Sequence, residues 1–433
     1  MTEKILASLK RLSIDEYIIN TEEMRSAQMF FIKKTLDTKR IENTASFAVT
    51  VFKVFEKNEK TYKGSSMVHI YSGMTDEEID KSLSTAYLAA SFVCNPSYEL
   101  QEKTKNETVI MDSDMNGRTL EECADIMTEA LFAEDKRTDV FINSAELFIY
   151  EKSVRTVISN GVDVGYVKRY VSGEFVAQCK EPQDVETYKD FSYDSLDAEA
   201  LKNRVKTTLE YTVSRAKAKT APKAGNYRVI LGEAFVKDIF SYYVQRASAP
   251  YIFAKYSSFK IDEDIQSKTA DGGNSEVKGD KISLKLIAKE PFSNEGTPQK
   301  DMVMMEDGIL KSYHGGVRFS RYIGTEPTGY YGSLRVQPGS VSLEEMKKEP
   351  YLYIVNFSDF QMDDFSGHFG GEIRLAFLYD GENVTEVTGG SINGSILESQ
   401  FNMFMSKETQ KDSDFEGPVA ICFENIPVAG TVL

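Results

Sequence analysis

Histidine is scarce in this sequence, which has three among 433 residues: His69, His314 and His368. Zinc hydrolases commonly hold their metal with two histidines on one helix turn and a third ligand. No two histidines here have a spacing that places them on one helix face, and the four cysteines form no C-x-x-C pair. These absences exclude a zinc site built from one local motif, and we predict no metal or other cofactor.

Motifs for nucleotide binding and serine hydrolysis are also absent. The sequence contains neither G-x-x-x-x-G-K-[ST] nor G-x-G-x-x-G, and it has no G-x-S-x-G elbow. A cysteine–histidine dyad stays open, because such partners meet only in space. Cys422 lies in the apolar segment 419–423, so a buried structural thiol is expected there. The acidic pair Asp363 and Asp364 is expected to be exposed charge.

Acidic residues outnumber basic residues by 67 to 51, which gives a net charge of −16. Such a surface repels phosphate backbones and anionic lipids, so we expect no nucleic-acid partner and no membrane partner. No apolar run is long enough for a membrane helix, and the N-terminal residues lack the apolar core of a signal peptide. Cysteines without a disulfide pattern favour a reducing compartment. We therefore expect a cytoplasmic protein.

Apolar periodicity divides the first half of the chain into helices and strands. Two capping boxes, Thr75–Glu78 and Thr119–Glu122, predict where two of the helices begin. The predicted helices are 4–12, 75–90, 119–132 and 196–216. The predicted strands are 28–34, 46–56, 62–71, 140–150, 153–159, 165–171 and 174–178. The segment 101–113 is expected to be a polar connector.

Strands punctuated by glycine dominate the second half. Asp307-Gly308 and Asp380-Gly381 are typical of tight hairpin turns, because such turns need positive φ. An apolar strand at 227–231 precedes a predicted helix at 235–245. Proline and glycine between 217 and 225 indicate the main domain boundary. The expected fold class is α+β, with mixed α/β segments at 1–105 and 106–222 and a largely antiparallel β domain at 223–433.

Short motifs of the second half occur in an informative order. The segment 307–313 has the pattern G-x-L-K-x-Y, and the segment 336–345 has P-G followed by two glutamates. An F-S pair begins the segment 365–374, and glycines follow at 389–394. Together these motifs resemble the TldD/PmbA family, once described as modulators of DNA gyrase and now regarded as peptidase-related. The resemblance covers about residues 20–430 by the order of its motifs.

Catalytic members of that family carry H-E-x-x-x-H on the helix after a Val-Ile-Leu-Gly strand. An ungapped alignment of this strand places the two histidines at Ser241 and Arg246 and the glutamate at Tyr242. These three side chains cannot supply two imidazole ligands and a carboxylate base. The sequence is therefore closer to the PmbA/TldE companion type, which lacks the motif. The resemblance then implies no catalytic residue and no metal ligand.

Three other polar residues are candidates for a cleft. His368 lies in a glycine-rich turn before a strand, where it can face a cleft or satisfy loop carbonyls. Arg318 and Arg321 flank a Thr-Gly pair together with Arg335. Such arginines can bind a peptide carboxylate bidentately, or they can form salt bridges on an acidic surface.

The resemblance implies a non-catalytic companion subunit of a TldD-type zinc metallopeptidase that matures or degrades unfolded peptides. The expected partner is a TldD-like subunit with H-E-x-x-x-H, or a second copy of the chain in a dimer. Peptides are expected to bind as added strands. One alternative is a homo-oligomeric peptide-binding or scaffold protein without a protease role. The other is a peptidase with a non-zinc mechanism that uses Ser241 or Cys422.

Overall fold

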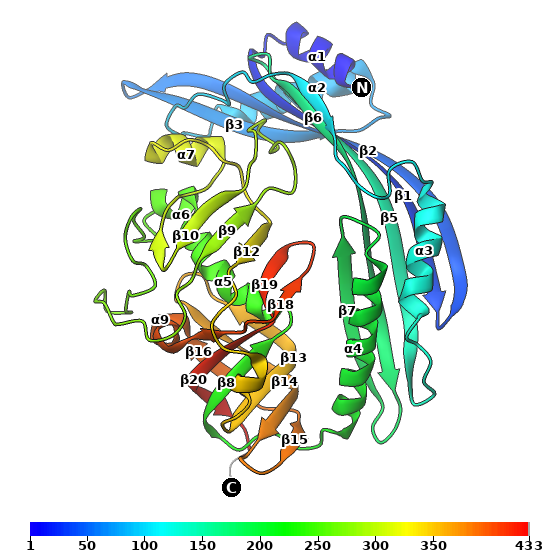
Figure 1. Ribbon diagram of the computed structural model, residues 1–433. Coiled ribbons are helices and arrows are strands. Elements are labelled where there is room, and N and C mark those ends of the chain that lie inside the picture. The colour runs from blue at the N-terminus through cyan, green and yellow to red at the C-terminus, as the bar shows by residue number, and fades with distance from the viewer. Residues whose placement is uncertain (432–433) are drawn as a thin grey trace.

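The computed structural model describes residues 1–431 and has two parts with different architectures (Figure 1). The first half forms a long, curved sheet that arches around the second half. The second half contains two further sheets and several short helices.

The sheet of the first half has the strand order β3-β2-β1-β5-β6-β4, and β7 pairs with another part of β6. Its strands are β1 (Glu16–Ile32), β2 (Thr35–Lys57), β3 (Lys60–Ile70), β4 (Glu107–Ile110), β5 (Val140–Ile158), β6 (Asp163–Cys179) and β7 (Val185–Tyr193). Side chains alternate between the two faces of a strand. Ile19 and Met29 of β1 therefore share the face covered by helices, whereas Ile18 packs with Phe292 of the second half.

Four helices cover one face of this sheet, and their ends agree with the sequence prediction. They are α1 (Thr2–Arg11), α2 (Asp76–Ala90), α3 (Leu120–Phe132) and α4 (Ala198–Lys217). Both predicted capping boxes are confirmed, because Thr75 Oγ1 accepts from the Glu78 amide at 3.3 Å and Thr119 Oγ1 from the Glu122 amide at 3.1 Å. A cap of this kind contributes about 1 kcal/mol to helix stability.

The second half contains a six-stranded sheet and a closed ring of strands. The six-stranded sheet has the order β11-β10-β9-β12-β19-β18. Its strands are β9 (Leu284–Ile287), β10 (Met302–Glu306), β11 (Ile309–Leu310), β12 (Ser333–Val336), β18 (Thr409–Lys411) and β19 (Phe415–Pro418). The ring runs β13-β8-β20-β16-β14 and closes because β14 also pairs with β13. The strands of the ring and its two attachments are β8 (Gly225–Gly232), β13 (Tyr351–Met362), β14 (His368–Tyr379), β15 (Val384–Val387), β16 (Ser391–Ser395), β17 (Phe404–Met405) and β20 (Ala420–Ala429).

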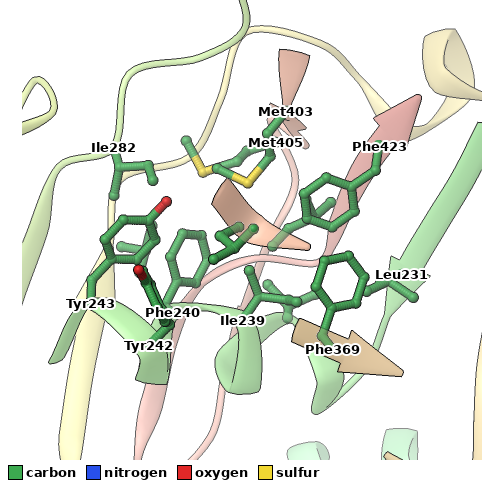
Figure 2. Close-up of a cluster of buried hydrophobic side chains, with 14 of the residues drawn as sticks. Leu231, Ile239, Phe240, Tyr242, Tyr243, Ile282, Phe369, Met403, Met405 and Phe423 are labelled. Carbon is green, nitrogen blue, oxygen red and sulfur yellow. The ribbon is translucent and has the colours of Figure 1, made fainter. Parts of the chain in front are cut away.

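Helix α5 (Phe235–Arg246) packs against the apolar interior of the second half (Figure 2). Ile239 and Phe240 are fully buried, and they lie among Phe369, Met405 and Phe423 from the surrounding strands. A buried side chain of this size contributes roughly 1.5–3 kcal/mol through the hydrophobic effect. The shorter helices are α6 (Ala249–Phe253), α7 (Val317–Ile323), α8 (Leu343–Met346), α9 (Ile396–Ser399) and the 3₁₀ helix η1 (Gln400–Asn402).

The α+β fold class is confirmed, and several predicted element boundaries are wrong. The segment 101–113 is not only a connector, because it contains β4. The four short strands predicted between 140 and 178 are two long strands, β5 and β6. Polar residues stay in these strands because they pair across the sheet, as Glu151 does with Arg169. Strand β6 also continues through Gly173. A Cβ at this position would lie 2.3 Å from the Glu146 carbonyl oxygen, so the close contact between β5 and β6 favours glycine here.

The second half is mostly antiparallel, as expected, but β13 with β8 and β12 with β19 are parallel pairs. Strands β1 to β7 share one sheet, and the division of the chain at residues 105 and 222 stays a prediction. The last two residues of the expected 223–433 segment lie outside the described residues. Within residues 1–431, every helix is too short or too polar to span a bilayer.

Candidate functional site

Helix α5 is the element on which the resemblance places a degenerate catalytic motif. It follows β8 after a tight turn in which Glu233 has φ 59°. Gly232 precedes that turn, and a Cβ there would lie 2.9 Å from the Tyr353 hydroxyl oxygen. The close approach of β8 to Tyr353 therefore leaves little room for a side chain at position 232.

Ser241 is engaged in a bond within α5. Its hydroxyl donates to the Asp238 carbonyl oxygen at 2.6 Å, which is a local bond to the preceding helix turn. Burial raises the pKa of the Asp238 carboxyl. Asp238 contributes its backbone carbonyl, and no carboxylate or imidazole hydrogen bond to the Ser241 hydroxyl is present within residues 1–431. The serine thus lacks the partner that would activate it as a nucleophile.

Tyr242 is part of the core. Its side chain is 1% exposed, and its ring contacts those of Tyr243 and Phe259 edge-on, at centroid distances of 5.3 and 6.2 Å. Burial raises the pKa of its hydroxyl, so the phenol stays protonated at neutral pH. A buried neutral phenol cannot act as the carboxylate base that this position has in the H-E-x-x-x-H pattern.

The positively charged side chain of Arg246 lies at the C-terminal end of α5. Its Nη1 donates to the carbonyl oxygens of Phe365 at 3.0 Å and of Asp364 at 3.4 Å. The guanidinium carbon lies 5.3 Å from the ring centroid of Phe259 and 5.5 Å from that of Tyr242. This is cation–π geometry, and it holds the charge between two aromatic rings.

Asp364 is the acidic neighbour of this cation. Burial raises the pKa of the Asp364 carboxyl, the charge of Asp363 raises it further, and Arg246 opposes both effects. Two polar atoms here, Asp364 Oδ1 and Arg246 Nε, are buried without a hydrogen-bond partner. The expectation of exposed charge holds for Asp363 and is wrong for Asp364, which is half-buried. The sequence did not identify Asp364 as a neighbour of Arg246, because only the fold brings these two residues together.

The residues at these positions do not fit a zinc ion. Arg246 brings a fixed positive charge where a ligand would be needed, Tyr242 is a protonated phenol, and Ser241 donates its hydroxyl proton to a carbonyl. Across residues 1–431, no group of three or more histidine, cysteine, aspartate and glutamate side chains is arranged to hold a metal.

The cleft candidates lie on separate elements. His368 is exposed at the start of β14 and lines a polar hollow of about 370 Å³ together with Asn393, Glu398 and Glu424. The lining of that hollow contains no arginine.

The two arginines belong to α7. There Arg321 pairs with Glu102 at 3.3 Å and with Glu326 at 3.6 Å, and Arg318 lies over the Phe319 ring. The structure thus brings Ser241, Tyr242 and Arg246 together on α5, and it does not bring His368 to the arginines.

Two further buried residues bear on the chemistry. Cys422 is fully buried, which confirms the expected buried thiol. Burial raises the pKa of this thiol, although Arg228 Nε donates to the sulfur at 3.2 Å.

His314 is 4% exposed, and its Nε2 lies 2.8 Å from the Val244 carbonyl oxygen at the end of α5. Burial lowers the pKa of His314, so its imidazole is neutral and supports the helix end.

Known proteins resemble this chain over its second half and in its whole fold. Residues 224–430 match the family model described as the PmbA/TldA metallopeptidase C-terminal domain. The crystal structure of TldE from Thermococcus kodakarensis superposes with a TM-score of 0.74 at 16% identity, and the match covers 98% of this chain and 100% of that one. A structure from Thermotoga maritima also gives a TM-score of 0.74, at 18% identity over 99% of each chain. At these identities the structures show a shared fold.

Two curated sequences are more similar in sequence and match a shorter region. An uncharacterized protein of Methanocaldococcus jannaschii is 25% identical over 268 residues, or 56% of this chain. The metalloprotease TldD homolog of Buchnera aphidicola is 28% identical over 193 residues, or 41% of this chain. The matched regions span 59% and 38% of the lengths of these two relatives.

Proposed function

We propose that this chain, whose residues 224–430 match the model of the PmbA/TldA metallopeptidase C-terminal domain, is a non-catalytic companion subunit of a TldD-type zinc metallopeptidase. In this role a TldD-like subunit supplies the zinc and the chemistry. The companion contributes to the site that admits unfolded peptides for maturation or degradation. We place this activity in the cytoplasm, where the cysteines remain free thiols.

Arg246 is the observation that carries this proposal. In the family's catalytic pattern this position holds a histidine ligand, and here it holds a cation bonded to the Phe365 carbonyl and packed on two aromatic rings. A guanidinium cannot be deprotonated to become a ligand. The residues that contact Arg246 come from α5, from the loop before β14 and from the segment that holds Phe259. Arg246 is therefore packed as part of the core.

A non-zinc peptidase is less well supported by the same geometry. Among residues 1–431 no base is bonded to the Ser241 hydroxyl, and Cys422 is fully buried with a raised thiol pKa. A reactive cysteine needs access and a lowered pKa. The homo-oligomeric scaffold remains a second candidate, because within residues 1–431 the part of β2 from 35 to 46 pairs only with β1 and leaves one edge of the long sheet open.

The test combines a metal assay with purification from the native cell. We expect the isolated chain to contain no stoichiometric zinc and no peptidase activity, and to co-purify with a subunit that carries H-E-x-x-x-H. Activity should return when the two chains are mixed, and a chelator should abolish it. Stoichiometric zinc with activity in the isolated chain would refute the proposal. Activity that survives the chelator and is lost in Ser241→Ala or Cys422→Ala would instead support the non-zinc mechanism.

A further inference from the structure

A hollow of about 370 Å³ lies between helix α4 and strand β7 of the first half and strands β13 and β18 of the second half. Figure 1 shows α4 and β7 beside the hairpin of β18 and β19. From α4, one face of the helix lines the hollow with Asn203, Arg204, Thr207 and Tyr211. Small-molecule sites often lie between domains and have volumes of about 300–1,000 Å³. The hollow is thus large enough for a small ligand.

The charged side chains of the hollow are mostly paired with one another. Lys189 of β7 pairs with Glu233, in the turn before α5, at 3.2 Å. Arg204 of α4 pairs with Asp412, which follows β18. Lys411, the remaining charged residue of the lining, is exposed to solvent. A charged ligand would have to compete with these ion pairs, so the lining favours an uncharged one.

Several uncharged polar groups of the hollow, in contrast, lack partners. Thr187 is 6% exposed, and within residues 1–431 its buried hydroxyl has no hydrogen-bond partner. Thr207 and Asn356 are half-buried, and their side chains make no hydrogen bond to the described part of the chain. An unpaired buried hydroxyl is destabilising, because it has lost its bonds to water without replacement. A ligand with hydrogen-bonding groups would supply the missing partners.

A peptide strand is a poor candidate for this ligand. The edge of β7 beside α4 has carbonyl oxygens that already accept hydrogen bonds from arginines of α4. Arg215 donates to the Glu186 carbonyl oxygen, and Arg204 donates to the Asp190 carbonyl oxygen at 3.0 Å. A peptide that added to this edge as a strand would have to displace both arginines. The hollow therefore suits a compact ligand rather than an extended chain.

We propose that this hollow binds an uncharged small molecule rich in hydroxyl groups, of the size of a monosaccharide: a sugar or a polyol. A hydroxyl both donates and accepts, so it can pair with each of the unpaired groups. The rings of Tyr193 and Tyr211 line the same hollow and offer apolar surface to the C–H groups of such a ligand. The hollow adjoins the turn before α5, whereas Arg246 lies at the other end of that helix. The site therefore goes beyond the proposed function and does not depend on it.

Saturation-transfer NMR on the full chain tests the site, with ribose, glucose and sorbitol as probes. We expect at least one of them, at roughly 10 mM, to receive saturation from the protein, since this concentration exceeds a millimolar Kd. The signal reports bound molecules, so it is separate from the general stabilisation by sugars that are excluded from protein surfaces. Glutamate and triglycine represent a charged ligand and a peptide, and neither should displace the bound probe.

Two variants remove hydroxyls from the hollow and keep the side-chain shape. Thr187→Val and Thr207→Val should each weaken binding of the probe about fivefold, as expected for the loss of one neutral hydrogen bond. Thr187→Val should not lower the urea midpoint of the free chain, because the hydroxyl that it removes has no partner. Thr128→Val is the matched control, at a half-buried threonine of α3 outside the hollow, and should leave the affinity unchanged.

The outcomes separate the site from its ligand. Absence of saturation transfer to all three probes would overturn the proposal, and so would equal affinity in Thr207→Val, Thr187→Val and the control. Displacement of the probe by glutamate or by triglycine would overturn the assigned class of ligand.

Discussion

Arg246 offers the sharpest test of how the α5 site is built, through the variant Arg246→Met. The change removes hydrogen bonds from a charged donor, which contribute about 1.5–3 kcal/mol, and cation–π contacts worth about 0.5–1 kcal/mol. Methionine retains much of the packing between Phe259 and Tyr242. We therefore expect the variant to lose about 2–4 kcal/mol of stability near neutral pH.

The loss should depend on pH through Asp364. Burial raises the pKa of this carboxyl, and Arg246 is the neighbour that lowers it, so the pKa in the folded variant is higher still. An acid with a higher pKa in the folded state loses stability as pH rises from its unfolded pKa through its folded pKa. Arg246→Met should thus be most destabilised relative to the native chain near pH 7 and least near about pH 4.

Unfolding by urea, followed at both pH values, measures this dependence. Arg246→Lys is the matched control, because it keeps the charge while losing the planar fork, and it should keep most of the native pH profile. Adding Asp364→Asn to Arg246→Met should remove the extra pH dependence, since the titrating group is gone. An equal loss at both pH values in Arg246→Met would refute the role assigned to this pair.

Other predictions follow from single contacts. Tyr243→Phe should cost about 1–3 kcal/mol, because the Tyr243 hydroxyl donates to Gln400 Oε1 at 2.6 Å in the core and its loss leaves a buried acceptor unpaired. Tyr242→Phe removes a hydroxyl that makes no such bond to any residue from 1 to 431, and its urea midpoint should change much less. A thiol reagent should label exposed Cys94 in the native chain and buried Cys422 only after unfolding, which mass spectrometry can measure. Labelling of both at equal rates would contradict the assigned burial.

Local signals in the sequence predicted local structure well. A capping box needs only residues three positions apart, so Thr119 and Glu122 could be paired from the sequence alone. The turn at Asp307-Gly308 is also local, and both residues have the positive φ that such a turn needs. Strand lengths were underestimated, because polar residues such as Glu151 remain in β5 through partners on β6.

Long-range contacts were not predictable from these patterns. The ring closes where β14 pairs with β13, and no periodicity within either strand specifies that neighbour. The same limit applies to the site, since Arg246 and Asp364 lie 118 positions apart and meet only because β13 turns into β14 beside the end of α5. The sequence could single out Arg246 through the resemblance, but it could not supply the partners that hold its charge.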